Sequence, residues 1–121
     1  MKAEKINQHE TNFYAKVSPR FVNSMRGYIN NGSNRLQNNY KLTKKLEEYA
    51  RFGYDDYTIE MRQKSGPLGF EYKLYAVKDD EDASKEVVLT KKHYTAYSKI
   101  FNRFMNLNEH DFKNIMRKYT K

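Results

Sequence analysis

The sequence predicts an α+β protein with the element order ααβββαα, and three observations support this class. Apolar residues recur with a helical period towards both ends of the chain. Between them, two stretches alternate apolar and polar residues as strands do, and a segment rich in glycine and proline, 64–69, separates them. We therefore expect two N-terminal helices, a central three-stranded antiparallel sheet and two C-terminal helices. They form a single domain over residues 13–121, preceded by a mobile arm over 1–12.

The first elements follow from local signals. Residues 12–18 are short and aromatic, as in an edge strand. Ser18 is placed to cap the helix that follows, and Pro19 suits its first turn. Apolar side chains then recur at helical spacing over 21–29, and Gly32 marks the end of this helix.

The second helix begins after Ser33 or Asn34, either of which can cap it, and ends before Gly53. Two helices joined by a short turn containing glycine fit either a helix-turn-helix or an ordinary helical hairpin. The apolar face expected for the second helix consists of Leu36, Tyr40, Leu42, Leu46, Tyr49 and Ala50.

The central sheet is predicted from alternation. Residues 57–62 and 70–77 form a β-hairpin around the turn 64–69, and residues 86–90 form a third strand. Thr90 is then expected to cap the third helix.

The two C-terminal helices each show one apolar side. The third helix carries Tyr94, Tyr97, Ile100, Phe101 and Phe104 on that side. The fourth begins at Asn108, with acidic residues in its first turn, where the helix dipole favours them. Its expected buried residues are Phe112, Ile115, Met116 and Tyr119.

Charge is distributed in three blocks. Residues 1–53 hold ten basic and four acidic residues, 54–90 hold five and nine, and 91–121 hold eight and two. The whole chain carries a net charge of +8. Because basic patches attract polyanions through steering and counterion release, nucleic acid, or a protein that handles it, is the first partner to consider.

Composition excludes several kinds of site. With no cysteine, the chain has no disulfide, thiolate metal site or cysteine nucleophile. The sequence has no signal-peptide core and no run of eighteen uncharged apolar residues, so we expect a cytoplasmic protein that makes no membrane contact. His9, His93 and His110 lack the spacing of metal ligands, and no glycine-rich phosphate loop is present, so no cofactor is expected.

The polar face of the second helix is one candidate nucleic-acid surface. Two helices followed by a hairpin over residues 12–77 resemble part of a winged-helix domain, in which the second helix enters the major groove. The leading helix of that family is missing here, and the same face suits a solvated helix. The candidate base and phosphate contacts are Arg35, Asn38, Lys41, Lys44 and Lys45.

The C-terminal region is a second candidate surface. Its cations lie beside tyrosines in the sequence, a combination that single-strand binders use to stack bases and bind phosphates. Tyr94 and Tyr97 fall on the apolar side of the predicted helix and are assigned to the core, which leaves the cations as non-specific phosphate contacts. The cations are Lys91, Lys92, Lys99, Arg103, Lys113, Arg117, Lys118 and Lys121, of which we select Lys113, Arg117 and Lys118.

A third pattern concerns catalysis. Asp56 precedes the first predicted hairpin strand and Glu71 and Lys73 lie on the second, which resembles the PD-(D/E)xK nuclease pattern. The resemblance implies two carboxylates that hold a divalent metal and a lysine that assists water attack. Glu-x-Lys also occurs by chance in charged chains, and no proline precedes Asp56.

The sequence therefore predicts a small, basic, non-enzymatic nucleic-acid-associated protein of phage or mobile-element type, a DNA-binding regulator or accessory factor. Its partner would be DNA or RNA. The alternative is a phage-encoded inhibitor, as anti-CRISPR proteins are, that binds a host nucleic-acid-binding protein or ribonucleoprotein. For that alternative the acidic residues Asp79, Asp80 and Asp82 are the candidate contacts, because they can occupy a cationic channel.

Overall fold

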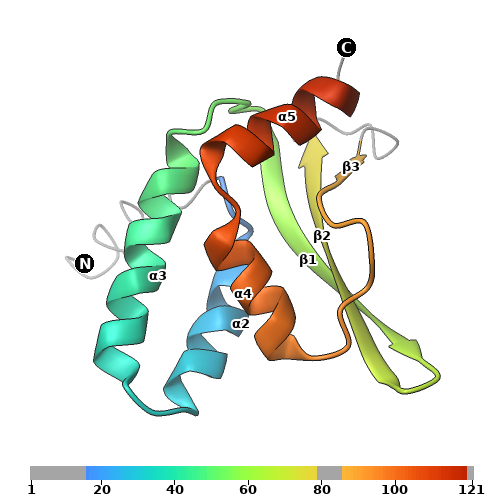
Figure 1. Cartoon of the computed structure of the whole chain (residues 1–121). Helices are drawn as coiled ribbons and strands as arrows, with labels where there is room; N and C mark the ends of the chain where they lie inside the picture. The colour runs from blue at the N-terminus through green and yellow to red at the C-terminus, as the bar shows by residue number, and fades with distance from the viewer. Residues whose placement is uncertain (1–15, 79–85, 120–121) are drawn as a thin grey trace, which may run out of the picture. The chain divides into compact units, whose positions relative to one another are not determined.

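The computed structural model describes residues 16–78 and 86–119 and confirms the predicted α+β class (Figure 1). Within these residues the order is two helices, a three-stranded antiparallel sheet and two helices. The chain divides into two compact units, unit 1 (Met1–Asp55) and unit 2 (Asp56–Lys121), which are treated separately below. The predicted arm, 1–12, lies outside the described residues, and the single domain over 13–121 stays a prediction.

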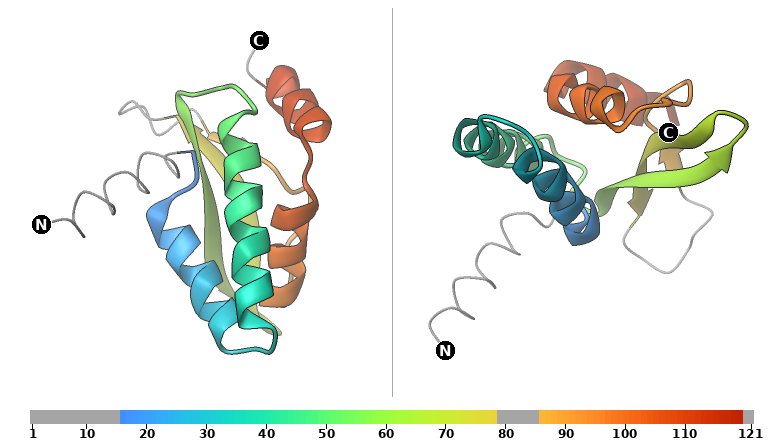
Figure 2. Two further views of the ribbon diagram at one scale, coloured as in Figure 1. Left: turned by 90° about the vertical axis from the view of Figure 1, so that its left-hand side faces the viewer. Right: turned by 90° about the horizontal axis from the view of Figure 1, so that it is seen from below.

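Unit 1 contains α2 (Pro19–Asn30) and α3 (Arg35–Ala50), which lie side by side (Figure 2). Pro19 occupies the first turn of α2, as predicted, although the Ser18 side chain makes no capping hydrogen bond. The buried side chains of α2 are Phe21, Val22, Met25 and Ile29, and those of α3 are Leu42, Leu46 and Tyr49. The predicted strand over 12–18 is not found among its described residues, where Lys16 lies in a turn and Val17 in an isolated bridge.

The predicted apolar face of α3 is wrong at three of its six positions. Leu36 and Tyr40 are 90% and 62% exposed, and Ala50 is also exposed. Helical residues are offset by about 100° each, so Tyr40 lies about 200° around the helix from buried Leu42. The inward position one turn before Leu42 belongs instead to Asn39.

Polar side chains join α2 to α3 at this end. Asn39 accepts a hydrogen bond from Arg26 Nη1 at 3.0 Å and donates one to Asn30 Oδ1 at 2.9 Å. Arg26 Nη2 also donates to Thr43 Oγ1 at 3.4 Å. Asn39 and Thr43 therefore make the polar contacts of α3 to α2 at this end, while Leu36 and Tyr40 stay exposed.

Unit 2 begins with the predicted hairpin, formed by β1 (Tyr57–Gly66) and β2 (Gly69–Lys78) (Figures 1 and 2). Pairing continues to Gly66 and Gly69, so the loop consists only of Pro67 and Leu68, shorter than the predicted turn. Gly69 has a φ of +119°, which favours glycine. Since β3 (Glu86–Val88) pairs only with residues 75–77, the far half of the hairpin extends beyond it.

Thr90 does not cap a helix, contrary to the prediction. It is buried, and its hydroxyl accepts a hydrogen bond from the Leu74 backbone N–H at 3.2 Å. The chain after β3 continues along the edge of β2, where Tyr72 and Tyr94 exchange backbone hydrogen bonds of 2.8 and 2.9 Å. The third helix, α4 (Tyr97–Asn106), therefore starts seven residues after Thr90.

The core of unit 2 lies on one face of the sheet. Ile59, Leu74 and Ala76 are fully buried there, and α4 packs on β2. The last helix, α5 (Glu109–Tyr119), begins where predicted, because Asn108 Oδ1 accepts a hydrogen bond from the Asp111 N–H at 2.8 Å. The two helices contribute Ile100, Phe104, Phe112 and Met116 to the buried residues.

The opposite face of the sheet carries a bidentate ion pair between Arg62 of β1 and Glu86 of β3. Arg62 Nη1 donates to Glu86 Oε1 at 3.0 Å, a second donor contacts Oε2, and the guanidinium lies 4.3 Å from the Tyr75 ring centroid. The hydrogen bond from Arg62 lowers the pKa of Glu86 below its ordinary value of 4.5. The pair joins the outer strands across β2.

We expect this pair to stabilise unit 2 by less than about 1 kcal/mol, because its side chains are 44% and 26% exposed and solvent screens them. A lowered pKa in the folded state means that the stabilisation is present above about pH 4.5 and is lost as the pH falls through the folded pKa. Urea denaturation at neutral pH should thus give a lower free energy of unfolding for Glu86→Gln than for the unchanged protein. The difference should shrink in acid. A difference that is constant between neutral pH and pH ~3 would contradict this linkage.

Candidate functional site

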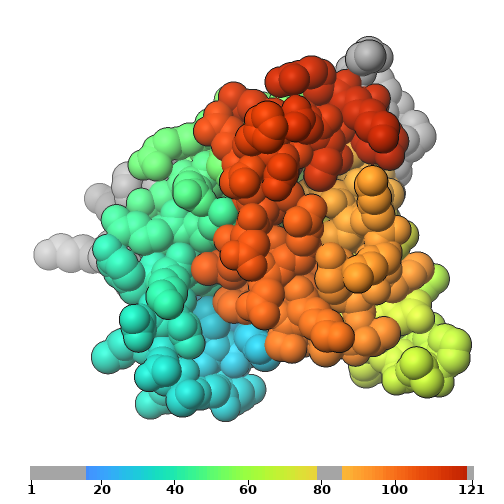
Figure 3. Space-filling view, in the orientation of Figure 1, coloured from blue at the N-terminus to red at the C-terminus, as the bar shows by residue number. Residues whose placement is uncertain are grey.

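Unit 2 contains a pocket of about 440 Å³ bounded by β3, the segment that follows it, α4 and α5. In Figure 3 the segment after β3, in orange, lies next to α5, in red. The lining residues are Val88, Leu89, Thr90, Lys91, Lys92, Tyr94, Arg103, Asn114, Ile115, Lys118 and Tyr119.

The charge of the pocket has one sign. Its lining includes Lys91, Lys92, Arg103 and Lys118 and contains no aspartate or glutamate. The three lysines are exposed and Arg103 is half-buried. None of these four side chains forms an ion pair with another residue in the described part of the chain. Within the described residues, no carboxylate therefore neutralises these four charges.

Two tyrosines stand beside these cations. Tyr94 is half-buried and Tyr119 is 61% exposed. The Lys92 Nζ lies 5.6 Å from the Tyr94 ring centroid, and the Lys118 Nζ lies 5.8 Å from that of Tyr119. Ring and ammonium are thus within the range of a cation–π contact in both pairs.

The sequence-based assignment of both tyrosines to the helical core was wrong. Tyr94 precedes α4 and is held in an extended segment by its backbone bonds to Tyr72. Tyr119 lies in the last turn of α5, one turn beyond buried Met116, and Ile115 is only half-buried. Their side chains line the pocket instead.

The structure separates the three cations selected on the last helix. Lys118 lines the pocket, whereas Arg117 is exposed outside the lining. The Lys113 Nζ lies 2.7 Å from Glu109 Oε2, one turn earlier in α5. Lys99 is exposed away from the lining, and Lys121 lies outside the described residues. The pocket cations Lys91, Lys92 and Arg103 were recognised as basic in the sequence but not selected.

The predicted contacts on α3 are only partly available. Arg35 and Lys41 are exposed. Lys45 Nζ lies 2.8 Å from Glu48 and its side chain is only 10% exposed, packed over the Tyr49 and Phe52 rings. The other two predicted contact residues make weaker interactions. Lys44 lies 3.9 Å from Glu47, and Asn38 donates a hydrogen bond to the Ser33 carbonyl at 3.3 Å.

The nuclease-like residues do not come together. Asp56 lies at one end of the hairpin, 3.5 Å from Lys78, whereas Glu71 lies towards the other end, 3.9 Å from His93. Asp56 lies eight residues before Lys64, the partner of Glu71 in the strand register, which is about 26 Å along the strand at roughly 3.3 Å per residue. Within residues 16–78 and 86–119, no three His, Asp or Glu side chains are grouped to hold a metal ion. Glu71 and Lys73 therefore do not share a metal site with Asp56.

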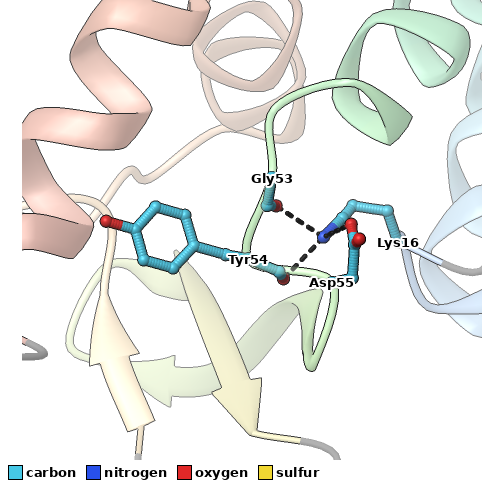
Figure 4. Close-up of polar contacts among 4 residues, drawn as sticks. All are labelled: Lys16, Gly53, Tyr54 and Asp55. Atoms are coloured by element: carbon cyan, nitrogen blue, oxygen red, sulfur yellow. Dashed lines mark hydrogen bonds and ion pairs between the residues drawn. The ribbon is translucent and has the colours of Figure 1, made fainter.

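A buried lysine in unit 1 has a structural role (Figure 4). Lys16 is 6% exposed, and its Nζ donates to the carbonyls of Gly53 and Tyr54 at 2.6 and 2.5 Å. Asp55 Oδ1 lies 3.2 Å from the same nitrogen. Three acceptors satisfy the three donors of the ammonium group, so this lysine fixes the chain after α3.

The acidic residues Asp79, Asp80 and Asp82, selected for the inhibitor alternative, lie outside the described residues. Among the helices that the structure describes, none combines the length and the apolar content needed to cross a membrane. Comparisons with protein-family models, curated proteins and solved structures found no match to this chain. The fold and the site thus define an α+β protein with a basic, tyrosine-bearing pocket.

Proposed function

We propose that this protein binds nucleic acid and that the pocket of unit 2 is its contact surface. The observation that carries this proposal is the charge of the lining: Lys91, Lys92, Arg103 and Lys118 meet there without a carboxylate. Basic side chains that meet phosphates displace the counterions condensed on the nucleic acid, which makes binding favourable and dependent on salt.

Two features favour this pocket over the surface of α3. Its cations have no ion pair within the described residues, whereas Lys44 and Lys45 lie beside glutamates of their own helix. Its lining also offers tyrosine rings and apolar side chains next to the charges. The α3 surface provides Arg35 and Lys41 as exposed cations, and neither lines this pocket.

The proposal is tested by exchanging three lysines, Lys91, Lys92 and Lys118, for glutamine. The affinities for a short duplex and a short single strand should fall, and the slope of log affinity against log salt should flatten by about two units, at ~0.7–0.9 per phosphate contact. Fluorescence anisotropy with labelled oligonucleotides over a salt series measures both quantities. Circular dichroism verifies that the variant is folded.

The matched control is the exchange of Arg35, Lys41 and Lys44 for glutamine, which removes the same charge from α3. It should leave the slope nearly unchanged. If the α3 variant flattens the slope and the pocket variant does not, the pocket is the wrong surface. If neither oligonucleotide binds the unchanged protein, nucleic-acid binding itself is rejected. The inhibitor alternative then remains to be tested, with exposed Leu68 and Phe70 at the hairpin end as candidate apolar contacts.

A further inference from the structure

Resting on the proposed function, we propose that the pocket receives an unpaired base of single-stranded nucleic acid while the cations around it bind the flanking phosphates. The base would lie against Tyr119, the more exposed of the two rings, and the phosphates against Lys91, Lys92, Arg103 and Lys118. The bound nucleic acid is thus single-stranded, and one of its bases enters the pocket.

The shape of the site supports binding of a base and not of phosphates alone. A surface that contacts only phosphates needs no hollow, because the phosphates of a duplex lie on its outside. Here the cations surround about 440 Å³, within the roughly 300–1,000 Å³ typical of small-molecule sites. The space admits a flat ring together with part of its sugar.

The chemistry of the lining is complementary to a nucleotide. Val88, Leu89 and Ile115 present apolar surface, and Tyr94 and Tyr119 present rings, between the charged groups. A ligand that combines an apolar ring with an anion complements this mixture, and a nucleotide unit is such a ligand. Bases stack on aromatic side chains with little dependence on base identity, since every base has a π face.

The placement of the lysines allows the base and its phosphate to be bound together. Lys92 and Lys118 each hold their ammonium group within 6 Å of the neighbouring ring centroid, at 5.6 and 5.8 Å. Each ammonium group lies over one ring, so a stacked base would take the opposite ring face and the lysine would bind its phosphate. In a duplex the bases are paired and stacked inside the helix, so they enter such a pocket only after extrusion, which costs free energy. The pocket should accordingly favour single strands.

The test compares three ligands by fluorescence anisotropy at one salt concentration: oligothymidine, an abasic strand of equal length and a duplex with the same number of phosphates. Oligothymidine should bind most tightly. Tyr119→Ala should weaken its binding by about 5- to 150-fold, the range for loss of one stacked base, and leave binding of the abasic strand unchanged. Tyr119→Phe keeps the ring and should keep the affinity.

Tyr40→Ala is a matched control. Tyr40 is 62% exposed, and Lys44 Nζ lies 5.4 Å from its ring centroid, yet Tyr40 belongs to α3 and lines no part of the pocket. Its replacement should leave all three affinities unchanged. Equal binding of oligothymidine and the abasic strand, or tighter binding of the duplex, would overturn the inference and leave nucleic-acid binding intact. Loss of affinity for both single strands in Tyr119→Ala would also overturn it, whereas failure of every ligand to bind rejects the proposed function as well.

Discussion

Replacement of Lys16 by methionine is expected to destabilise unit 1 by about 2–4 kcal/mol. Methionine keeps most of the apolar stem but removes the ammonium group, which holds the carbonyls of Gly53 and Tyr54. A hydrogen bond from a charged donor contributes roughly 1.5–3 kcal/mol, and water can replace part of it because both residues are only half-buried. Urea denaturation followed by far-UV circular dichroism measures the change.

The backbone at this point adds to the expected effect. Gly53 and Tyr54 have φ angles of +85° and +56°, so two consecutive residues lie in the left-handed region, which is unfavourable for tyrosine. This conformation directs both carbonyls towards the single ammonium group of Lys16 (Figure 4). Lys16 Nζ is the common donor that binds the two carbonyls.

Asp55→Ala is the control for this prediction. The Asp55 side chain is 88% exposed, so its ion pair with Lys16 should contribute less than about 1 kcal/mol. If Asp55→Ala destabilises the protein as much as Lys16→Met, the ion pair and not the carbonyl contacts provides the stability, and the role assigned to Lys16 is wrong.

Phe104→Ala should destabilise unit 2 by about 3–5 kcal/mol, the largest single effect that we expect. Phe104 lies on α4, is fully buried and belongs to the core that covers the sheet. Truncation to alanine removes the apolar burial of a whole ring and leaves a cavity that the neighbouring side chains fill only in part. The same denaturation experiment, at a fixed pH, measures the loss.

Phe70→Ala provides the comparison on an exposed site. Phe70 is 52% exposed near the end of the hairpin, so its truncation should cost less than about 1 kcal/mol. Equal losses for the two variants would contradict the assignment of Phe104 to the core. Because the pocket includes Arg103, which adjoins Phe104 in α4, a partly folded Phe104→Ala protein should also bind oligonucleotides less tightly.

Local signals in the sequence determined several elements correctly. Pro19 at the start of α2, Asn108 at the start of α5 and the glycines around the β1–β2 loop act on the backbone within a few residues of themselves. Alternation likewise predicted both hairpin strands, because one face of each strand is buried. The backbone signals do not depend on distant parts of the chain, and the alternation is visible within a single strand, so both can be deduced from short stretches.

Tertiary contacts decided the features that sequence reasoning assigned wrongly. Thr90 has the chemistry of a helix cap, but its hydroxyl binds the backbone of Leu74, sixteen residues away. Tyr94 shares the helical spacing of α4, yet its pairing with Tyr72 keeps it extended and places its ring at the pocket. Both outcomes depend on the part of the β2 edge that β3 leaves unpaired, before residue 75. A local sequence pattern does not show this edge.

The pocket and the Lys16 contacts likewise could not be predicted from local sequence patterns, because both bring together residues that are far apart in the sequence. The basic character of residues 91–121 could be counted in the sequence, but α4 and α5 had to pack beside β3 before Arg103 and Lys118 met Lys91 and Lys92. Lys16 similarly finds its carbonyl partners 37 and 38 residues away. Charge and helical period are properties of single segments of the sequence. Which side chains meet depends instead on which segments pack together, and only the tertiary structure determines that.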